Sequence, residues 1–524
     1  MEILKRIVVY FLVFILTVLS GPVTQQDPVC DFPKAAVEAK ELLLTYIPSD
    51  GSKLTLTSMQ GLLANISDRN ILFRIDGYEK WLPYTQAKLV TSQPDGSPWD
   101  FKSLLNEFAP LFDGYILCDD GSAAIALSIA KQKNSIVVLP EFEEAAQAAG
   151  LKMTIDVRGW TDLKLRSSPE FRKLNRKVAF EQPASYAPWL LDYAVMCGAY
   201  IWYDPDATRL EHTNAYRFLD DNALVFGWNP DIGEYNPVLS LSRLNACMVP
   251  ADWAMNLSVL SGFKYNEIKQ KTAAGSELKG RTVCLLMSDG DNLQWFISNY
   301  GDTSHYGSPV RGSFPFAWGV PAGAADVAAP LAERYYSQMT ENDSFVLSLS
   351  GLGYTYPSKW TSRKALTGMA QTLGQKMRLL DAHELLVLDD GGFESKSTDI
   401  LLRQTQANGI FYIDFHDYSG LNGQIRFVDG KPIVSAKYKL WNNLPGGSPD
   451  EIASAINALP TDTKDPDSYA FINVHAWSGM NENGEFVDGA DTMKAVERLV
   501  SKLDADTSVV SPDQFMQKIS DNLG

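Results

Sequence analysis

The chain has 524 residues, a net charge of −17 at pH 7 and 45% hydrophobic residues. This length suggests about three or four domains, and the hydrophobic content supports large cores rather than a disordered chain. The acidic excess argues against nucleic acid and anionic membrane surfaces as partners, because both require a basic face.

The first residues have the order of a secretory signal peptide. Lys5 and Arg6 precede an apolar run from 7 to 19, and Ser20 and Gly21 supply small residues near a cleavage point. The run is shorter than the roughly 20 residues of a transmembrane helix, although an uncleaved anchor is the alternative. We therefore assign residues 1–21 to a signal peptide. The protein is expected to be secreted or located in the cell envelope (periplasmic or extracellular), without stable membrane insertion.

The cysteines are widely spaced and contain no CxxC pair; they are Cys30, Cys118, Cys197, Cys247 and Cys284. This spacing predicts neither a disulfide framework nor a thiolate zinc site. Cys118 and Cys284 lie in apolar runs and are expected to be buried. One disulfide bond among the other cysteines is not excluded.

The N-terminal half divides into three predicted small α/β domains. Residues 31–114 mix helix and strand patterns, with a strand at 70–75. Residues 115–185 alternate in the order of a parallel β/α unit, with strands at 115–118, 135–139 and 152–157 and helices at 122–131 and 141–149. Residues 186–265 form the third domain, which is rich in Trp, Asp and Pro and whose topology the pattern does not determine.

The polar segment 264–280 is predicted to be a linker, and residues 281–524 to form a C-terminal domain. Helical patterns there separate apolar strand patterns at 282–287, 314–320, 344–349, 384–388, 409–413, 470–474 and 508–510. This alternation predicts a β/α barrel, regular or irregular, of seven or eight strands. An open doubly wound sheet is the alternative, and 424–436 has the pattern of an inserted hairpin.

Carboxylates, aromatic rings and histidines gather where these strands end. In a β/α barrel the active site lies at the carboxyl ends of the strands, so these side chains are expected on one face. The candidate catalytic residues are Asp289, Asp291, Asp390, Glu394 and Asp414, and the candidate substrate-binding residues are Trp318, Tyr354, Tyr356, His416, His475 and Trp477. The structural alternatives are a strand-to-helix turn at 289–292, in which Asn292 caps the next helix, and core positions for the aromatic rings and the histidines.

The most specific motif is a loop with the sequence Gly351-Leu352-Gly353-Tyr354-Thr355-Tyr356-Pro357. Its glycines permit a tight turn, the proline fixes the exit, and tyrosines at positions i and i+2 project to the same side of an extended segment. Such a pair of rings suits stacking on a sugar and hydrogen bonding to its hydroxyls. A well-packed turn is the alternative.

This loop resembles the signature of the GxGYxYP family of putative glycoside hydrolases, and all its fixed positions match: Gly351, Gly353, Tyr354, Tyr356 and Pro357. The resemblance extends to the layout of an exported chain with small N-terminal domains before the domain that holds the signature. It implies a carbohydrate substrate. It transfers no catalytic pair, so the candidate carboxylates rest on the strand-end argument.

Three functions fit these residues. The leading hypothesis is glycoside hydrolysis by a carboxylate pair, with Asp289 or Asp291 from the first strand and Asp390, Glu394 or Asp414 as partner. The acid is expected beside Trp or Tyr, because an apolar wall raises its pKa.

The second hypothesis is a metal-dependent hydrolase similar to polysaccharide deacetylases, in which Asp291, His416 and His475 hold Zn²⁺. The histidines of those enzymes are close together in sequence, whereas these are far apart. The third is a glycan-binding protein without catalysis, in which the carboxylates accept hydrogen bonds or hold Ca²⁺. The leading hypothesis requires no cofactor, and the sequence leaves the oligomeric state open.

Overall fold

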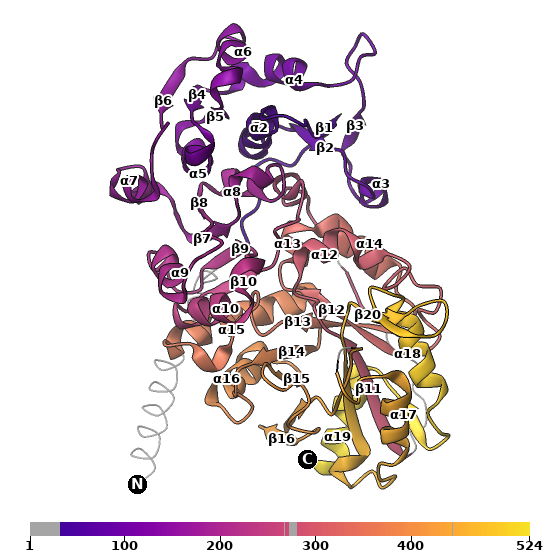
Figure 1. The fold of residues 1–524 in the computed structure, drawn as a ribbon. Coiled ribbons are helices and arrows are strands. Elements are labelled where there is room, and N and C mark those ends of the chain that lie inside the picture. Colours follow the sequence, from indigo (N-terminus) through magenta and orange to yellow (C-terminus); the bar gives the residue numbers. More distant parts are fainter. Residues whose placement is uncertain (1–31, 267, 272–279, 443) are drawn as a thin grey trace, which may run out of the picture.

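The computed structural model describes residues 32–266, 268–271, 280–442 and 444–524. Figure 1 shows small α/β units of the N-terminal half (indigo to magenta) beside a larger C-terminal α/β domain (pink to yellow). The predicted signal peptide, Cys30 and the centre of the predicted linker lie outside the described residues. In the described part of the chain, no helix combines the length and apolarity that crossing a membrane requires.

The first unit is a parallel sheet with the strand order β2-β1-β3. Its strands are β1 (Glu41–Thr45), β2 (Arg69–Phe73) and β3 (Lys88–Val90), and its helices are α2 (Ser52–Ile66), α3 (Tyr78–Trp81) and α4 (Phe101–Phe108). Helix α2 also packs on α8 (Leu191–Cys197), and a Cβ on Gly61 would lie 2.2 Å from the Asp192 carbonyl oxygen. The N-terminal units therefore share one core.

The second unit has the predicted parallel β/α order, with the strand order β5-β4-β6. Its elements are β4 (Gly114–Leu117), α5 (Ala123–Lys133), β5 (Ser135–Val138), α6 (Glu143–Ala148), β6 (Met153–Asp156) and α7 (Asp162–Ser167). Cys118 at the end of β4 and Cys284 in the C-terminal domain are buried, as predicted.

The third unit is a parallel sheet with the strand order β10-β9-β7-β8. Besides α8, its elements are β7 (Asn175–Glu181), β8 (Ala199–Trp202), α9 (Arg209–Tyr216), β9 (Leu224–Gly227), α10 (Tyr235–Arg243), β10 (Cys247–Val249) and α11 (Leu257–Leu260). The predicted boundary between 185 and 186 is wrong, because β7 pairs with β8 and β9 and so belongs to this unit.

The C-terminal domain is built on one curled sheet with the strand order β16-β17-β15-β14-β13-β12-β11-β19-β18, and β22 pairs with β11. Its strands are β11 (Arg281–Met287), β12 (Phe316–Pro321), β13 (Asp343–Ser348), β14 (Glu384–Asp389), β15 (Gly409–Asp414), β16 (Ile425–Val428), β17 (Lys431–Ser435), β18 (Tyr438–Leu440), β19 (Tyr469–Val474) and β22 (Thr507–Val509). The predicted alternation of strands and helices and the predicted hairpin, β16–β17, are confirmed.

Helices cover the outer face of this sheet (Figure 1). They are α12 (Leu293–Ile297), α13 (Ala324–Val327), α14 (Ala329–Ser337), α15 (Arg363–Leu379), α16 (Lys396–Thr405), α17 (Pro449–Asn457) and α18 (Thr492–Ser501), and a small hairpin of β20 (Ser478–Met480) and β21 (Phe486–Asp488) precedes α18. The last helix, α19 (Pro512–Leu523), lies on the other face. Phe515 of α19 enters the concave side and stacks on Phe411 at 5.9 Å between ring centroids. Helix α19 thus fills the inside of the sheet.

The sheet curls as a half-barrel. Strands β17 and β18 are consecutive in the chain, yet they pair with β15 and β19. At the step between them, the Ala436 N–H donates to Tyr412 O and the Lys437 N–H donates to Phe471 O, both at 2.9 Å. The α/β class and the curled parallel sheet agree with the sequence, whereas a closed barrel of seven or eight strands stays a prediction.

The described part of the predicted linker is held against the C-terminal domain. The Gln270 N–H donates to Asp381 Oδ2 at 2.8 Å, and the Gln270 side chain donates to Phe345 O at 2.9 Å. Ile268 is buried. These residues are therefore a docked segment rather than a free surface excursion.

Candidate functional site

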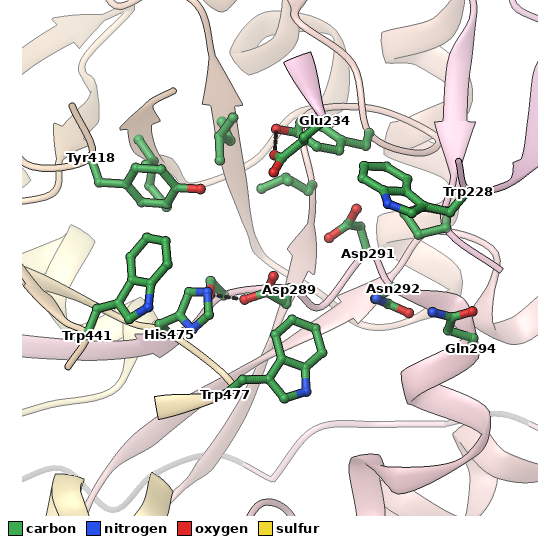
Figure 2. Close-up of a pocket in the computed structure, with 16 residues that line it drawn as sticks. Trp228, Glu234, Asp289, Asp291, Asn292, Gln294, Tyr418, Trp441, His475 and Trp477 are labelled. Carbon is green, nitrogen blue, oxygen red and sulfur yellow. Dashed lines mark hydrogen bonds between the residues drawn. The ribbon is translucent and has the colours of Figure 1, made fainter. Parts of the chain in front are cut away.

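A cavity of about 360 Å³ lies between the third unit and the carboxyl ends of the C-terminal strands. Trp228, Glu234 and Pro250 from the third unit form one part of its wall, and the C-terminal domain provides the rest. Figure 2 shows the carboxyl groups of Asp289, Asp291 and Glu234 on this cavity, with aromatic rings around them. None of the described residues that line it is Lys or Arg.

The segment after β11 carries two of the acids. Asp289 has a φ of 62°, a left-handed conformation that Asp tolerates better than most residues, and it accepts a hydrogen bond from the Ser288 hydroxyl. A Cβ on Gly290 would lie 2.3 Å from the Gly319 backbone, so only glycine fits between the two strand ends. Asn292 then caps α12 by accepting from the Trp295 N–H. The capping expected at this turn is confirmed, and the same turn places Asp289 and Asp291 on the cavity.

The surroundings of Asp291 favour its neutral form, because they raise its pKa. Its side chain lies on the cavity wall and the residue is only 7% exposed. Burial, and then the negative charges of Asp289 and Glu234, raise its pKa to about 8. An Asp with such a pKa carries a proton that it can donate at pH 7.

The third acid, Glu234, comes from the third unit, one residue before α10. The Tyr354 hydroxyl donates to Glu234 Oε1 at 2.5 Å. Burial raises the pKa of Glu234, against the opposing effect of this hydrogen bond, and the charge of Asp289 raises it further. Sequence analysis missed Glu234, because nothing in the pattern of 186–265 places that segment over the end of β11.

The signature loop joins the third unit to the C-terminal domain. Tyr354 and Met248 of β10 exchange backbone hydrogen bonds of 2.9 and 2.6 Å. A Cβ on Gly353 would lie 2.4 Å from Met248 O, which explains the glycine at this position. The Tyr356 N–H donates to Ser242 Oγ at 2.8 Å. The motif therefore fixes the position of the unit that supplies Glu234.

The prediction that both tyrosines form an exposed stacking platform is wrong. Tyr354 is 4% exposed and Tyr356 is fully buried. Tyr354 reaches the cavity wall, whereas the ring of Tyr356 packs against Tyr235 and Phe415. The loop is pressed between two packed units, so its rings face the protein interior instead of solvent.

Aromatic side chains line two sides of the cavity. Trp441 stacks on His475, with 4.0 Å between the ring centroids and 5° between the planes. Tyr418 meets Trp441 edge-on, and Trp477 is 37% exposed. In Figure 2 these rings lie across the carboxyl groups from Trp228. Flat aromatic faces on a cavity with hydrogen-bonding groups suit the apolar faces of sugar rings.

The structure therefore brings together part of the predicted set. Asp289, Asp291, Tyr354, His475 and Trp477 line the cavity. The sequence-based candidates did not include Glu234, Trp228, Tyr418 and Trp441, which also line it. Tyr418 follows a predicted strand and could have been selected, whereas Trp441 follows the short strand β18, which sequence analysis did not identify as a separate strand.

Trp318 does not reach the cavity. It is fully buried, its indole N–H donates to Asp343 Oδ1 at 3.0 Å, and its ring packs against Tyr306 and Phe316. Successive strand residues point to opposite faces, and Trp318 points toward the helices while Ala317 points to the inside of the sheet. The predicted role as a binding surface is wrong for this reason.

The remaining predicted carboxylates and His416 lie outside the cavity lining. Asp390 accepts from Lys359 at 2.9 Å and from the Tyr235 hydroxyl at 2.8 Å, and His416 Nε2 lies 3.3 Å from its other oxygen. The Glu394 side chain is 77% exposed, near Arg426. Asp414 accepts from the Gly391 and His416 backbone N–H groups. These are local contacts of strand-end loops, and they do not converge with Asp291.

The predicted zinc ligands are not brought together either. Asp291 and His475 line the cavity, but His416 is outside its lining and contacts Asp390. Among the described residues, no group of three His, Cys, Asp or Glu side chains is arranged to hold a metal ion. The donor set of the deacetylase hypothesis is therefore not assembled.

Comparison with known proteins gives a consistent result for most of the chain. Residues 280–520 match the model of the GxGYxYP putative glycoside hydrolase C-terminal domain, residues 176–262 the GxGYxYP third domain, and residues 112–166 the GxGYxYP_N second domain. The crystal structure of a putative hydrolase from Bacteroides thetaiotaomicron is similar, with a TM-score of 0.81 and 25% identity over 95% of this chain and 99% of that one. No curated protein matches the chain.

Proposed function

The chain belongs to the GxGYxYP family, and from this premise we propose that it hydrolyses glycosidic bonds at the carboxyl groups of Asp289, Asp291 and Glu234. The family suggests a carbohydrate substrate. The observation that carries the proposal is the convergence of three acids from two units on one aromatic-walled cavity, where burial and the neighbouring carboxylates raise the pKa of Asp291 to about 8.

The chemistry needs one carboxylic acid and one carboxylate. Asp291 gives its proton to the glycosidic oxygen as the bond between this oxygen and the anomeric carbon breaks. Asp289 faces the positive charge that develops on the sugar, as base toward the incoming water or as nucleophile. Water supplies the hydroxyl that ends on the anomeric carbon and the proton that restores Asp291 by the end of the cycle.

Glu234 acts beside this pair. Its charge contributes to the raised pKa of Asp291, and its hydrogen bond from Tyr354 fixes the carboxyl group at the cavity wall. Its remaining oxygen is available to a sugar hydroxyl. In this account the signature tyrosine is a positioning residue, and the signature glycine allows the third unit to approach.

Substitution of the two acids after β11 tests the proposal. Asp289→Asn and Asp291→Asn each keep the shape of the side chain and remove its acid or base function. Hydrolysis of a susceptible glycan is expected to fall by roughly 10²- to 10⁴-fold in each variant. Glu394→Gln is the matched control, because that carboxylate is exposed outside the cavity, and it is expected to leave the rate unchanged.

Full activity of both asparagine variants would contradict the assignment. Retained glycan binding by a wild-type protein that cleaves no glycan would favour the alternative of a glycan-binding protein without catalysis. We also propose that the protein is exported, because of the basic and apolar order of its first residues. Sequencing of the mature protein is expected to find a start between residues 20 and 26, and an intact Met1 would contradict cleavage.

A further inference from the structure

A second aromatic surface lies beside the cavity, on loops of the third unit. Trp253 is 52% exposed and Tyr186 is 38% exposed. The Trp253 ring contacts both Tyr186 and Trp189. The ring centroids of Tyr186 and Trp253 are 5.5 Å apart with 33° between the planes. Single exposed apolar residues are common on proteins, whereas exposed rings in contact with one another form a contiguous apolar patch, which is the kind of surface that ligands use.

This surface is built on a fixed scaffold. Gln182 is fully buried, and its side-chain amide donates to Asp252 O at 2.8 Å and to Trp189 O at 3.4 Å. The Leu190 N–H donates to Ala254 O at 2.6 Å. The two loops that carry the rings are therefore tied together, and the rings need little further ordering when a ligand binds.

The loop that carries Trp253 lies next to the cavity wall. The Trp253 N–H donates to Gln294 Oε1 at 2.5 Å, and Gln294 also lines the cavity. Pro250, another lining residue, lies three positions before Trp253 in the chain, so their Cα atoms are at most about 11 Å apart.

We propose that Tyr186, Trp189 and Trp253 form an additional subsite for an uncharged oligosaccharide chain that extends out of the cavity. Stacking on aromatic faces is how such a ligand gains affinity without charge, and no Lys or Arg is among the described cavity-lining residues to favour an anionic glycan. A protein partner fits less well, because a standard interface covers about 800 Å² per partner. Trp253 and Tyr186 are only 52% and 38% exposed, so together they offer at most about 225 Å² of accessible ring surface.

This inference rests on the proposed function, since it takes the cavity as the place where sugar binds. The test measures binding and not turnover. Calorimetry on the full mature chain carrying Asp291→Asn compares dimers and hexamers of cello-, xylo-, manno- and malto-oligosaccharides. We expect a hexamer to bind about tenfold more tightly than its dimer through the extra stacking contact.

Adding Trp253→Ala is expected to abolish this length advantage, and Trp253→Phe, which keeps a ring, is expected to preserve most of it. Leu163→Ala is the matched control, because Leu163 is 77% exposed on α7, and it is expected to keep the full advantage. An unchanged length advantage in Trp253→Ala, or no binding by any hexamer, would overturn the subsite. A length advantage that depends on Trp253, together with a wild-type protein that cleaves no glycan, would support the subsite and contradict the proposed hydrolysis.

Discussion

Asp291→Asn is expected to stabilise the fold at neutral and basic pH while it removes activity. The folded protein keeps the Asp291 proton up to a pKa of about 8, whereas the unfolded chain releases it near pH 4. Between these values the unfolded state binds fewer protons, so wild-type stability falls as pH rises. About three pKa units separate the ordinary pKa from pH 7, and each is worth about 1.4 kcal/mol. Burial of this acid therefore lowers the stability of the wild type by up to about 4 kcal/mol at pH 7. The amide of Asn does not ionise, so the variant lacks this cost.

Urea unfolding of wild type and variant at pH 3, 4, 6 and 8 measures this effect. The two proteins are expected to have similar stability at pH 4, and Asp291→Asn is expected to gain relative to wild type at each higher pH. Asp390→Asn is a control with the opposite sign. Burial alone would raise the pKa of Asp390, but Lys359 and Tyr235 lower it, so that variant loses stability at neutral pH and recovers as pH falls below about 4. A constant difference between wild type and Asp291→Asn at all pH values would refute the reasoning.

Three further outcomes follow from the same contacts. Tyr354→Phe removes the hydrogen bond to Glu234 and is expected to lower kcat/KM by about 10- to 100-fold, because a hydrogen bond to a charged group is worth about 1.5–3 kcal/mol. Tyr356→Phe is the milder comparison, because the Tyr356 hydroxyl lies 3.3 Å from that of Tyr354 and does not hydrogen-bond to Glu234 directly. Equal rates in both variants would contradict the positioning role of Tyr354. Gly353→Ala is expected to cost about 1–3 kcal/mol of stability by urea unfolding, because its Cβ would meet Met248 O, whereas Gly121→Ala, with its nearest atom at 3.6 Å, is expected to be neutral; unchanged stability of Gly353→Ala would contradict the close approach. The kcat of glycan hydrolysis is expected to fall as pH rises through about 8, because Asp291 loses the proton that it donates; a rate that rises through this range would assign the acid to another group.

The periodicity of the sequence predicts the C-terminal architecture well, because buried parallel strands are apolar runs separated by helices. The β11 segment shows how far this extends. The apolar run 282–287 predicts the strand, and the Asp-Gly-Asp-Asn segment after it predicts acids at its carboxyl end, which is where Asp289 and Asp291 lie. Local pattern is sufficient here because the strand and the site are adjacent in sequence.

The rest of the site depends on contacts between distant segments. Glu234 reaches the cavity only because the third unit docks on the signature loop, and a single sequence contains no pattern for that contact. Trp318 shows a second limit. It follows the strand pattern, but its position in the alternation directs its ring toward the helices. Asp390 likewise follows β14, and contacts with Lys359 and Tyr235 engage it outside the cavity.

The most direct test of the central claim is a crystal structure of the Asp291→Asn variant with a bound oligosaccharide. We expect a glycosidic oxygen within about 3.2 Å of the amide at position 291, with the Asp289 carboxylate facing the anomeric carbon, Glu234 on a sugar hydroxyl and a sugar ring against Trp441 or Trp228. A sugar bound away from Asp289, or a bound metal ion at His475 that contacts the scissile group, would contradict it.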